Sequence, residues 1–396
     1  MWHFVCCKEP VQKITSLFLS VWLISTACAA DSLQLSQVLQ RIRKLQIQHT
    51  TNDFPAGIFP SYREYNGRNI MRSDDNAFFT GLVVLTLQNL RSYLSPADLL
   101  VCDSISSEAA AIYPLFRNKT GRSTYNFWRT NPPVVFPNGG WLNWMNRSHA
   151  LPDDIDDTAI LLMVMNAPDS TVAGIHALMQ HHTNTGKKRK KTRYKDYRDI
   201  PAYSTWFGKR FPTDLDMCVL SNALYMLQRY HQPFTAADSA SLRFITTAID
   251  NGHYMDKPSY VSPHYARTPI ILYHLSRLMQ AGTLSALEQR RPALIAETQK
   301  QFAAAANPMD KILLAISLLR WKQPVPALEW HTDTDVFSYL EQNDFSFFIA
   351  NMASILTDPI RQWVSDTGLG RFYYYCPAYN NALLLEYLAL QQQAGK

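Results

Sequence analysis

Residues 151–166 read LPDDIDDTAILLMVMN, a cluster of acids that runs directly into an aliphatic segment. Apolar residues occupy nearly every position after the acids, so a helix formed here has no polar face. A helix that is apolar on all sides is buried on all sides. The stretch therefore predicts a core helix with acidic residues at its N-terminus.

Five further segments share this arrangement, in which a polar start leads into an aliphatic continuation. They cover residues 74–82, 214–230, 262–278, 307–321 and 376–390. Amphipathic segments alternate with them, and these have apolar residues at helical spacing and one polar face. The amphipathic segments cover residues 33–48, 96–115, 170–182, 236–250, 286–304 and 344–363.

The alternation of outer and inner segments predicts a fold of twelve helices. Short loops make consecutive helices antiparallel neighbours, and six buried helices ringed by six amphipathic ones form an (α/α)6 toroid. We therefore expect an all-α protein with one toroid domain over residues 31–396. The scarcity of turn-forming Gly, 14 residues in the chain, agrees with a helical fold. The alternatives are an irregular bundle and a solenoid, although a solenoid would show a constant repeat length.

The positive net charge of +6 comes from one stretch of the chain. Seven of the nine residues in 187–195 are Lys or Arg, and the remainder of the chain is close to neutral. Runs of like charge usually lie in solvated loops. We therefore expect a mobile surface loop here rather than a binding site for nucleic acid or anionic lipid, and no nucleic-acid partner.

The N-terminal residues have the pattern of a signal peptide. Lys8 and Lys13 come before an apolar run at 14–24, and Ala27-Cys28-Ala29 fits the cleavage pattern of small residues. The run is shorter than the about 20 apolar residues of a membrane span, and we expect no transmembrane helix in the mature chain. We expect residues 1–30 to be removed and the protein to be exported, to the periplasm or outside the cell, as a monomer. A lipid anchor on Cys28 is the alternative.

The cysteines and histidines do not form a recognisable metal or redox motif. Cys102, Cys218 and Cys376 remain after cleavage, and their odd number and wide spacing fit neither a disulfide framework nor a zinc site. The sequence contains no H-E-x-x-H pattern, Gly-rich phosphate loop or nucleophile elbow. We therefore expect no metal ligands and no cofactor.

The acid cluster at residues 153–157 contains four Asp in five positions. Capping of the helix explains one or two of them, because orphan N–H groups and the helix dipole favour acids at an N-terminus. Four carboxylates so close together repel one another, which raises the pKa of at least one. A carboxyl group that stays protonated near neutral pH can act as a general acid. We expect Asp156 to be that acid, with Asp154 and Asp157 as catalytic partners.

Residues 154–159, Asp-Ile-Asp-Asp-Thr-Ala, resemble the D-x-D-D-T-A motif of class II terpene cyclases, which are built from α/α toroids. The resemblance implies an acid-catalysed cyclase or isomerase in which Asp156 protonates an alkene or epoxide and Asp154 and Asp157 hold it. A second fragment, 204–207 with 214–223, is similar to toroids of the terpenoid cyclase and prenyltransferase superfamily. Class II cyclases normally have two toroidal domains, whereas this chain has room for one.

Three other functions fit the same residues. Asp153 to Asp157 also spells D-D-x-x-D, which resembles the motif with which class I terpene synthases bind Mg²⁺ and diphosphate. A glycan-active hydrolase or lyase would use two carboxylates and aromatic platforms for sugar rings. A non-catalytic protein that binds carbohydrate or another partner is the third alternative.

The starts of the inner helices should meet at one mouth of the toroid, where a small-molecule or glycan substrate would bind. Asp74, Asn222, Tyr379 and Asn381 are expected at this mouth. The predicted substrate-binding residues are Asp75, Asn76, Trp141, Tyr203, Trp206, Asp214, Asp216, His264, Tyr265, Arg267 and Asn380.

Overall fold

The computed structural model describes residues 35–65, 70–140, 151–186, 189–208, 211–329, 335–365 and 367–395. The protein is mostly helical and also contains a small antiparallel sheet. The predicted signal peptide with Cys28, Trp141 and the first two lysines of the basic run lie outside the described residues.

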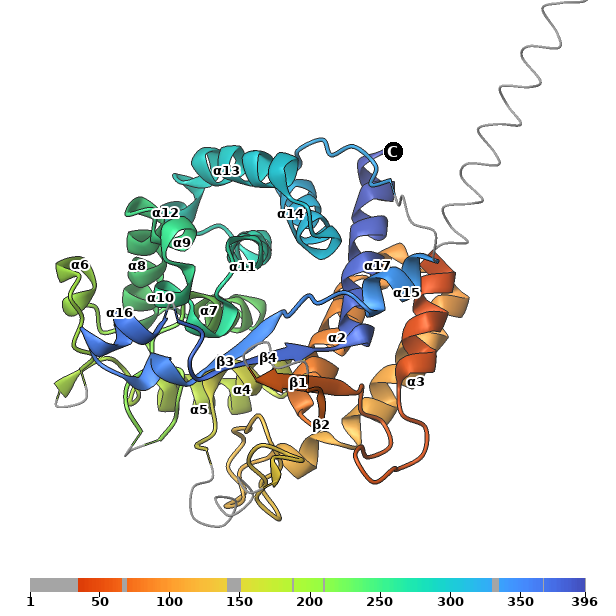
Figure 1. Ribbon diagram of the computed structural model, residues 1–396, viewed down its shortest axis with the longest axis horizontal. Helices are drawn as coiled ribbons and strands as arrows, with labels where there is room; N and C mark the ends of the chain where they lie inside the picture. The colour runs from red at the N-terminus through yellow and green to blue at the C-terminus, as the bar shows by residue number, and fades with distance from the viewer. Residues whose placement is uncertain are drawn as a thin grey trace, which may run out of the picture.

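Six long helices form a closed ring (Figure 1). They are α2 (Ala77–Asn89), α4 (Ile155–Val164), α7 (Met217–Arg229), α11 (Thr268–Ala281), α14 (Pro308–Arg320) and α17 (Pro377–Ala394). Each helix contacts the next one in this order, and α17 contacts α2. Each of these helices overlaps one of the six segments predicted to be buried, α2, α11 and α17 extend beyond theirs, and most of the helical residues are buried.

Amphipathic helices cover the outside of the ring. They are the helix of residues 35–45, α3 (Pro96–Ala110), α5 (Asp169–Met179), α8 (Ala236–Asp250), α13 (Arg291–Ala304) and α15 (Val336–Glu341). α3 packs against α2, α8 against α7, α13 against α14 and α15 against α17. Ion pairs join the helix of residues 35–45 to both neighbours, through Arg41 with Glu341 at 2.6 Å and Arg43 with Glu108 at 2.5 Å.

Short elements connect these helices. They are η1 (Arg91–Tyr93), η2 (Tyr113–Phe116), α6 (Lys195–Arg198), α9 (His253–Asp256), α10 (Pro258–Val261), η5 (Pro263–Tyr265), α12 (Ser285–Glu288), η6 (Met352–Ile355) and α16 (Ile360–Ser365). One helical run among the described residues, Pro96–Phe116, has the length and apolar composition of a membrane span. This run contains α3, which packs against α2.

The prediction of an all-α protein is wrong in one respect, because four strands form a sheet in the order β2-β1-β4-β3. The strands are β1 (Ser61–Tyr65), β2 (Arg72–Asp74), β3 (Phe348–Asn351) and β4 (Arg371–Tyr375). The sheet replaces the outer helix predicted at 344–363, which instead contains β3, η6 and the start of α16. Buried Phe347, Ile349 and Asn351 alternate there with less buried residues, and this period of two is that of a strand.

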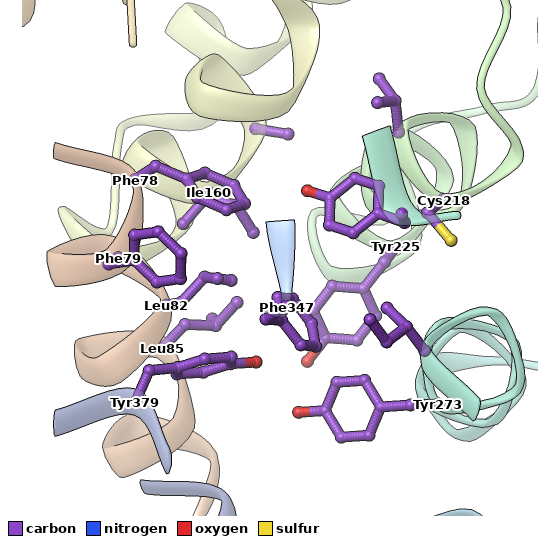
Figure 2. Packing of buried hydrophobic residues seen from close by; sticks show 14 of the residues in the cluster. Phe78, Phe79, Leu82, Leu85, Ile160, Cys218, Tyr225, Tyr273, Phe347 and Tyr379 are labelled. Atoms are coloured by element: carbon purple, nitrogen blue, oxygen red, sulfur yellow. The ribbon is translucent and has the colours of Figure 1, made fainter. Parts of the chain in front are cut away.

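The segment that leads into β3 enters the ring of helices. Figure 2 shows Phe347 between the side chains of α2 and α17 on one side and those of α7 and α11 on the other. Its ring lies 4.8 Å from Tyr379 and 5.5 Å from His274. The next residue, Phe348, packs at 5.1 Å against Phe78 at the start of α2. The sheet therefore closes the end of the ring at which the inner helices begin.

Polar side chains cap the starts of several inner helices. Asn76 accepts a hydrogen bond from the N–H of Phe79 in α2, and Asp154 accepts one from Asp157 in α4. Asp216 caps α7 in the same way. Satisfying these orphan N–H groups is the reason that acids and amides recur at these positions.

Candidate functional site

An apolar pocket lies between the start of α4, the residues Thr205, Trp206 and Phe211, and the sheet. Its cavity volume is about 50 Å³. The polar residues Asp154, Asp156, Asp157, Thr205, His264, Asn351 and Ser354 take part in its lining. Its aromatic lining residues are Phe127, Trp128, Phe136, Trp206, Phe211, Phe348 and Tyr374.

Asp154 has both a structural position and a perturbed acidity. Its side chain accepts the backbone N–H of Asp157 at 2.7 Å, which makes it the N-cap of α4. Burial raises the pKa of Asp154 to about 7, and the charges of Asp156 and Asp153 act in the same direction. The interpretation of this residue as a helix cap is therefore confirmed. The charges of the neighbouring carboxyl groups also act on it, as the crowding of four acids predicts.

Asp156 is held as a hydrogen-bond acceptor. Asn222 donates its amide N–H to one carboxyl oxygen at 2.6 Å, and the Tyr265 hydroxyl donates to the other. Burial raises the pKa of Asp156, while these two donors and the nearby charge of Arg277 act against that rise. The carboxylate form of Asp156 thus has two donors and a cation to stabilise it.

Asp157 has the opposite surroundings. Its Oδ1 atom is buried without a hydrogen-bond partner in the part of the chain that the structure describes. Burial and the adjacent Asp154 carboxylate raise the pKa of Asp157 well above its ordinary value. A carboxyl group in such a position keeps its proton, as one member of a carboxyl pair that shares a site does.

Asp153 faces away from the other three carboxyls. It accepts hydrogen bonds from Asn118 and Thr124, both at 2.5 Å, and pairs with Arg122 at 3.1 Å. Of the three acids of the D-D-x-x-D motif, Asp154 and Asp157 lie together and Asp153 is held apart by its own partners. Among the described residues, no group of three or more His, Cys, Asp or Glu could hold a metal ion.

His264 and Asp214 form a buried ion pair at the wall of the pocket. The His264 Nε2 atom lies 2.7 Å from Oδ2 of Asp214. Although burial acts against it, the carboxylate raises the pKa of His264 to about 9, so the ring is protonated. Burial would raise the pKa of Asp214, but His264, Lys190 and Arg361 together lower it.

Lys190 contradicts the expectation that the whole basic run is solvated. Its side chain is buried, and its ammonium group donates to the carbonyl of Ser354, a residue of the pocket wall. Burial lowers the pKa of Lys190 to about 8. The charge of Asp214 favours the protonated amine, and this attraction explains why one lysine of the run lies inside the protein.

Two further predicted residues belong to the pocket. Trp206 lines it, with its ring in an edge contact at 6.2 Å from His264 and its buried N–H without a partner among the described residues. Tyr265 reaches the site through Asp156.

Other predicted residues are engaged elsewhere. Asp75 pairs with Arg129, which opposes the rise of its pKa to about 6 on burial. Tyr203 donates to Asp238 at 2.7 Å, and Asn380 donates to the Leu340 carbonyl at 2.8 Å.

The last two predicted residues are also occupied. Arg267 pairs with Asp310. Asp216, in addition to capping α7, accepts from the Ser262 hydroxyl at 2.6 Å, and burial raises the pKa of Asp216 to about 6. The three cysteines expected to be core residues are free and buried.

Sequence reasoning missed most of the aromatic wall. Phe348 and Tyr374 come from the sheet, and Phe127 stacks on Phe348 at 5.1 Å. The signal for the two strand residues was present in the aromatic run of residues 371–375 and in the alternation at 347–351, which are typical of strands.

Comparison of the chain with protein-family models, with curated proteins and with solved structures finds no match. The chemical capability of the site therefore rests on its own geometry. Burial raises the pKa of Asp157 and of Asp156, the carboxylate of Asp214 raises the pKa of His264, and all three residues line a pocket with seven aromatic side chains.

Proposed function

We propose that this protein is an exported, terpenoid cyclase-like enzyme that protonates an unsaturated hydrocarbon chain. In this proposal the ring of inner helices and its outer layer are a single α/α toroid, of which the sheet closes one end. The closed order of helix contacts and the outer amphipathic helices support this description. The signal-peptide pattern of residues 1–30 supports export.

The observation that carries the proposal is the position of the acid. Asp157 has a pKa well above its ordinary value and lines a pocket to which seven aromatic residues contribute. An apolar wall excludes water, so a proton donated here passes to the substrate rather than to solvent. Aromatic faces also stabilise a cation without attacking it.

The proposed reaction is an isomerisation, because the substrate gains one proton and loses one. The O–H bond of the carboxyl group breaks, a C–H bond forms at one alkene carbon, and the other carbon becomes cationic. A second double bond of the same chain closes the ring, and the final cation loses a proton to the carboxylate that the donor has become, which restores both the neutral product and the acid. The Asp156 carboxylate, fixed by Asn222 and Tyr265, supplies the negative charge that offsets the cation.

The resemblance to class II cyclases assigns the donor to Asp156, whereas the contacts favour Asp157. Asp156 accepts two hydrogen bonds, and Asp157 has an unpartnered oxygen. We therefore propose Asp157 as the donor and Asp156 as the fixed carboxylate. Both assignments keep the same pocket and the same class of reaction.

The pocket favours a hydrocarbon over a glycan. Each sugar ring carries several hydroxyl groups that need hydrogen-bond partners when they are buried. Besides the acids and His264, the described lining offers Thr205, Asn351 and Ser354. An isoprenoid chain needs apolar contact instead, which seven aromatic residues of the lining supply.

The test is incubation of the purified protein in D₂O with squalene, geranylgeranyl diphosphate or cello-oligosaccharides. We expect a cyclic isomer of an isoprenoid that carries deuterium from the acid, detected by mass spectrometry. Asp157→Asn should lower the rate by at least about 100-fold, the contribution of a general acid. Turnover of the oligosaccharides alone would contradict the proposal.

Asp153→Asn is the matched control, because Asp153 belongs to the same cluster but faces away from the pocket. It should keep most of the activity.

Asp156→Asn distinguishes the two assignments of the donor. If Asp156→Asn abolishes the uptake of deuterium and Asp157→Asn does not, the resemblance identifies the donor correctly and the contacts do not.

A further inference from the structure

Large apolar side chains are exposed on and beside α16. Ile360 and Trp363 lie three residues apart, so they share one face of the helix. Ile360 is 57% exposed and Trp363 is 85% exposed. Leu369, 54% exposed, lies in the following loop, which returns to α16 through the bond from the N–H of Thr367 to the Val364 carbonyl.

The described part of the basic run docks against the same helix. The backbone N–H of Arg193 donates to Asp358 at 2.6 Å, and its guanidinium donates to Gln362 of α16 at 3.3 Å. Lys191 and Lys195 are exposed on either side of Arg193. The run therefore contacts α16 at Gln362, and it is not a distant loop.

This surface adjoins the wall of the pocket. α16 contacts η6, whose residues Met352, Ser354 and Ile355 line the pocket. Lys190, from the basic run, donates to the carbonyl of Ser354. One continuous stretch of the protein thus connects the exposed apolar residues, the basic run and the pocket.

We propose that the α16 surface, made of Ile360, Trp363, Leu369 and the cations Lys191, Arg193 and Lys195, binds an anionic lipid bilayer. Trp at the headgroup boundary, aliphatic side chains below it and lysines beside it are the pattern of an interfacial membrane contact. The cations are attracted to the negative surface of the bilayer. This inference does not depend on the reaction at the pocket, although a bilayer would also supply an apolar substrate.

The test is co-sedimentation of the protein with lipid vesicles. The protein used consists of residues 31–396, which contain every described element. We expect binding to phosphatidylcholine vesicles that contain phosphatidylglycerol, and weaker binding at high salt. Ile360→Ser with Trp363→Ser should lower the partition coefficient at least about tenfold, because the apolar contact is lost. Lys191→Gln with Lys195→Gln should lower it about tenfold on anionic vesicles only.

Matched controls carry the same changes elsewhere. Leu100→Ser removes an apolar residue that is 72% exposed on α3, and Lys300→Gln removes a cation on α13. Both should bind vesicles like the unaltered chain.

Three vesicle results would overturn the proposal. They are loss of binding in Leu100→Ser but not in the α16 variant, equal binding of all variants, and an absence of vesicle binding. A fluorescent duplex or single-stranded oligonucleotide bound more tightly than the vesicles would also overturn it.

Discussion

At the scale of single residues, adjacent acids have different surroundings because their partners differ. Asp153 and Asp156 each accept hydrogen bonds from two or more side chains, whereas one oxygen of Asp157 has no partner among the described residues. Donors to a carboxylate lower its pKa, and burial without donors raises it. A cluster that looks repetitive in sequence therefore provides a cap, a partly buried ion pair, a carboxyl held by two donors and a candidate acid.

These shifts make the free energy of unfolding depend on pH. The pKa of Asp154 is raised by burial to about 7, against about 3.9 in an unfolded chain. The folded protein then binds this proton more tightly than the unfolded chain, so stability falls as pH rises between these two values. His264 changes stability in the same direction. Its stabilising contribution is complete below about pH 6.5 and is lost as pH rises through about 9.

We predict that the protein unfolds at a higher temperature at pH 5 than at pH 9. Asp154→Asn keeps the cap and removes the buried charge, so it should raise the stability at pH 8 by on the order of 1–4 kcal/mol relative to its effect at pH 5. Thermal scans of both proteins across this range provide the measurement. A larger gain at pH 5 than at pH 8 would show that the charge on Asp154 is not the cause.

A raised pKa in the acid cluster could be predicted from the sequence, but the hydrogen-bond partners of each acid could not. Repulsion among four neighbouring aspartates predicted a raised pKa, but burial in the folded protein is the larger cause of the rise in Asp154, Asp156 and Asp157. The choice between Asp156 and Asp157 depends on Asn222 and Tyr265, which are distant in sequence. The burial of Lys190 depends in the same way on Asp214, to which no local pattern points.

At the scale of elements, the ring requires inner helices to approach one another closely. Gly81 in α2 faces α4, and a Cβ atom at this position would lie 2.8 Å from Cγ2 of Ile160. The β-branched Ile160 side chain has little rotamer freedom in a helix to move away. The absence of a side chain at Gly81 therefore sets the distance between α2 and α4.

We predict opposite effects of the same substitution at two helical glycines. Gly81→Ala should lower the free energy of unfolding by about 1–2 kcal/mol, because overpacking outweighs the gain in helix propensity. Gly174→Ala, in α5 with nothing within 4 Å of the new Cβ atom, should raise it by about 0.5–1 kcal/mol. Urea denaturation of both variants measures the difference. Stabilisation of both would mean that α2 and α4 are not packed as described.

Most helices could be predicted because their signals are long and periodic, whereas the strands could not. The apolar residues at helical spacing in 344–363 predict an amphipathic helix there, which the structure does not contain. Short strands such as β3 and β4 carry few residues from which to recognise a period of two. β4 pairs with β1, and these two strands lie far apart in the chain. The sheet is therefore a product of the tertiary structure.

At the scale of the whole molecule, the ring is closed by its last helix. α17 lies between α14 and α2, so residues near the end of the chain join the first inner helix to the fifth. Glu386 of α17 pairs with Arg320 of α14 and accepts from Tyr273 of α11 at 2.9 Å. These groups are buried, and three inner helices therefore share one polar contact in the core.

Breaking this contact should weaken the closure of the ring. Glu386→Ala leaves the Arg320 guanidinium buried without its carboxylate, which typically costs about 3–5 kcal/mol of stability. Asp250→Ala breaks the exposed pair of Asp250 with Arg290 and should cost less than about 1 kcal/mol. Replacing both buried partners, with Arg320→Met and Glu386→Leu, removes the unpaired charge and should recover most of the loss. Chemical denaturation of the four proteins tests this order.

Since the pair joins α14 to the helix that completes the ring, Glu386→Ala should also separate the single unfolding transition into two, with α17 released first. A small loss in Glu386→Ala, equal to that in Asp250→Ala, would mean that the ring does not depend on this pair for its closure.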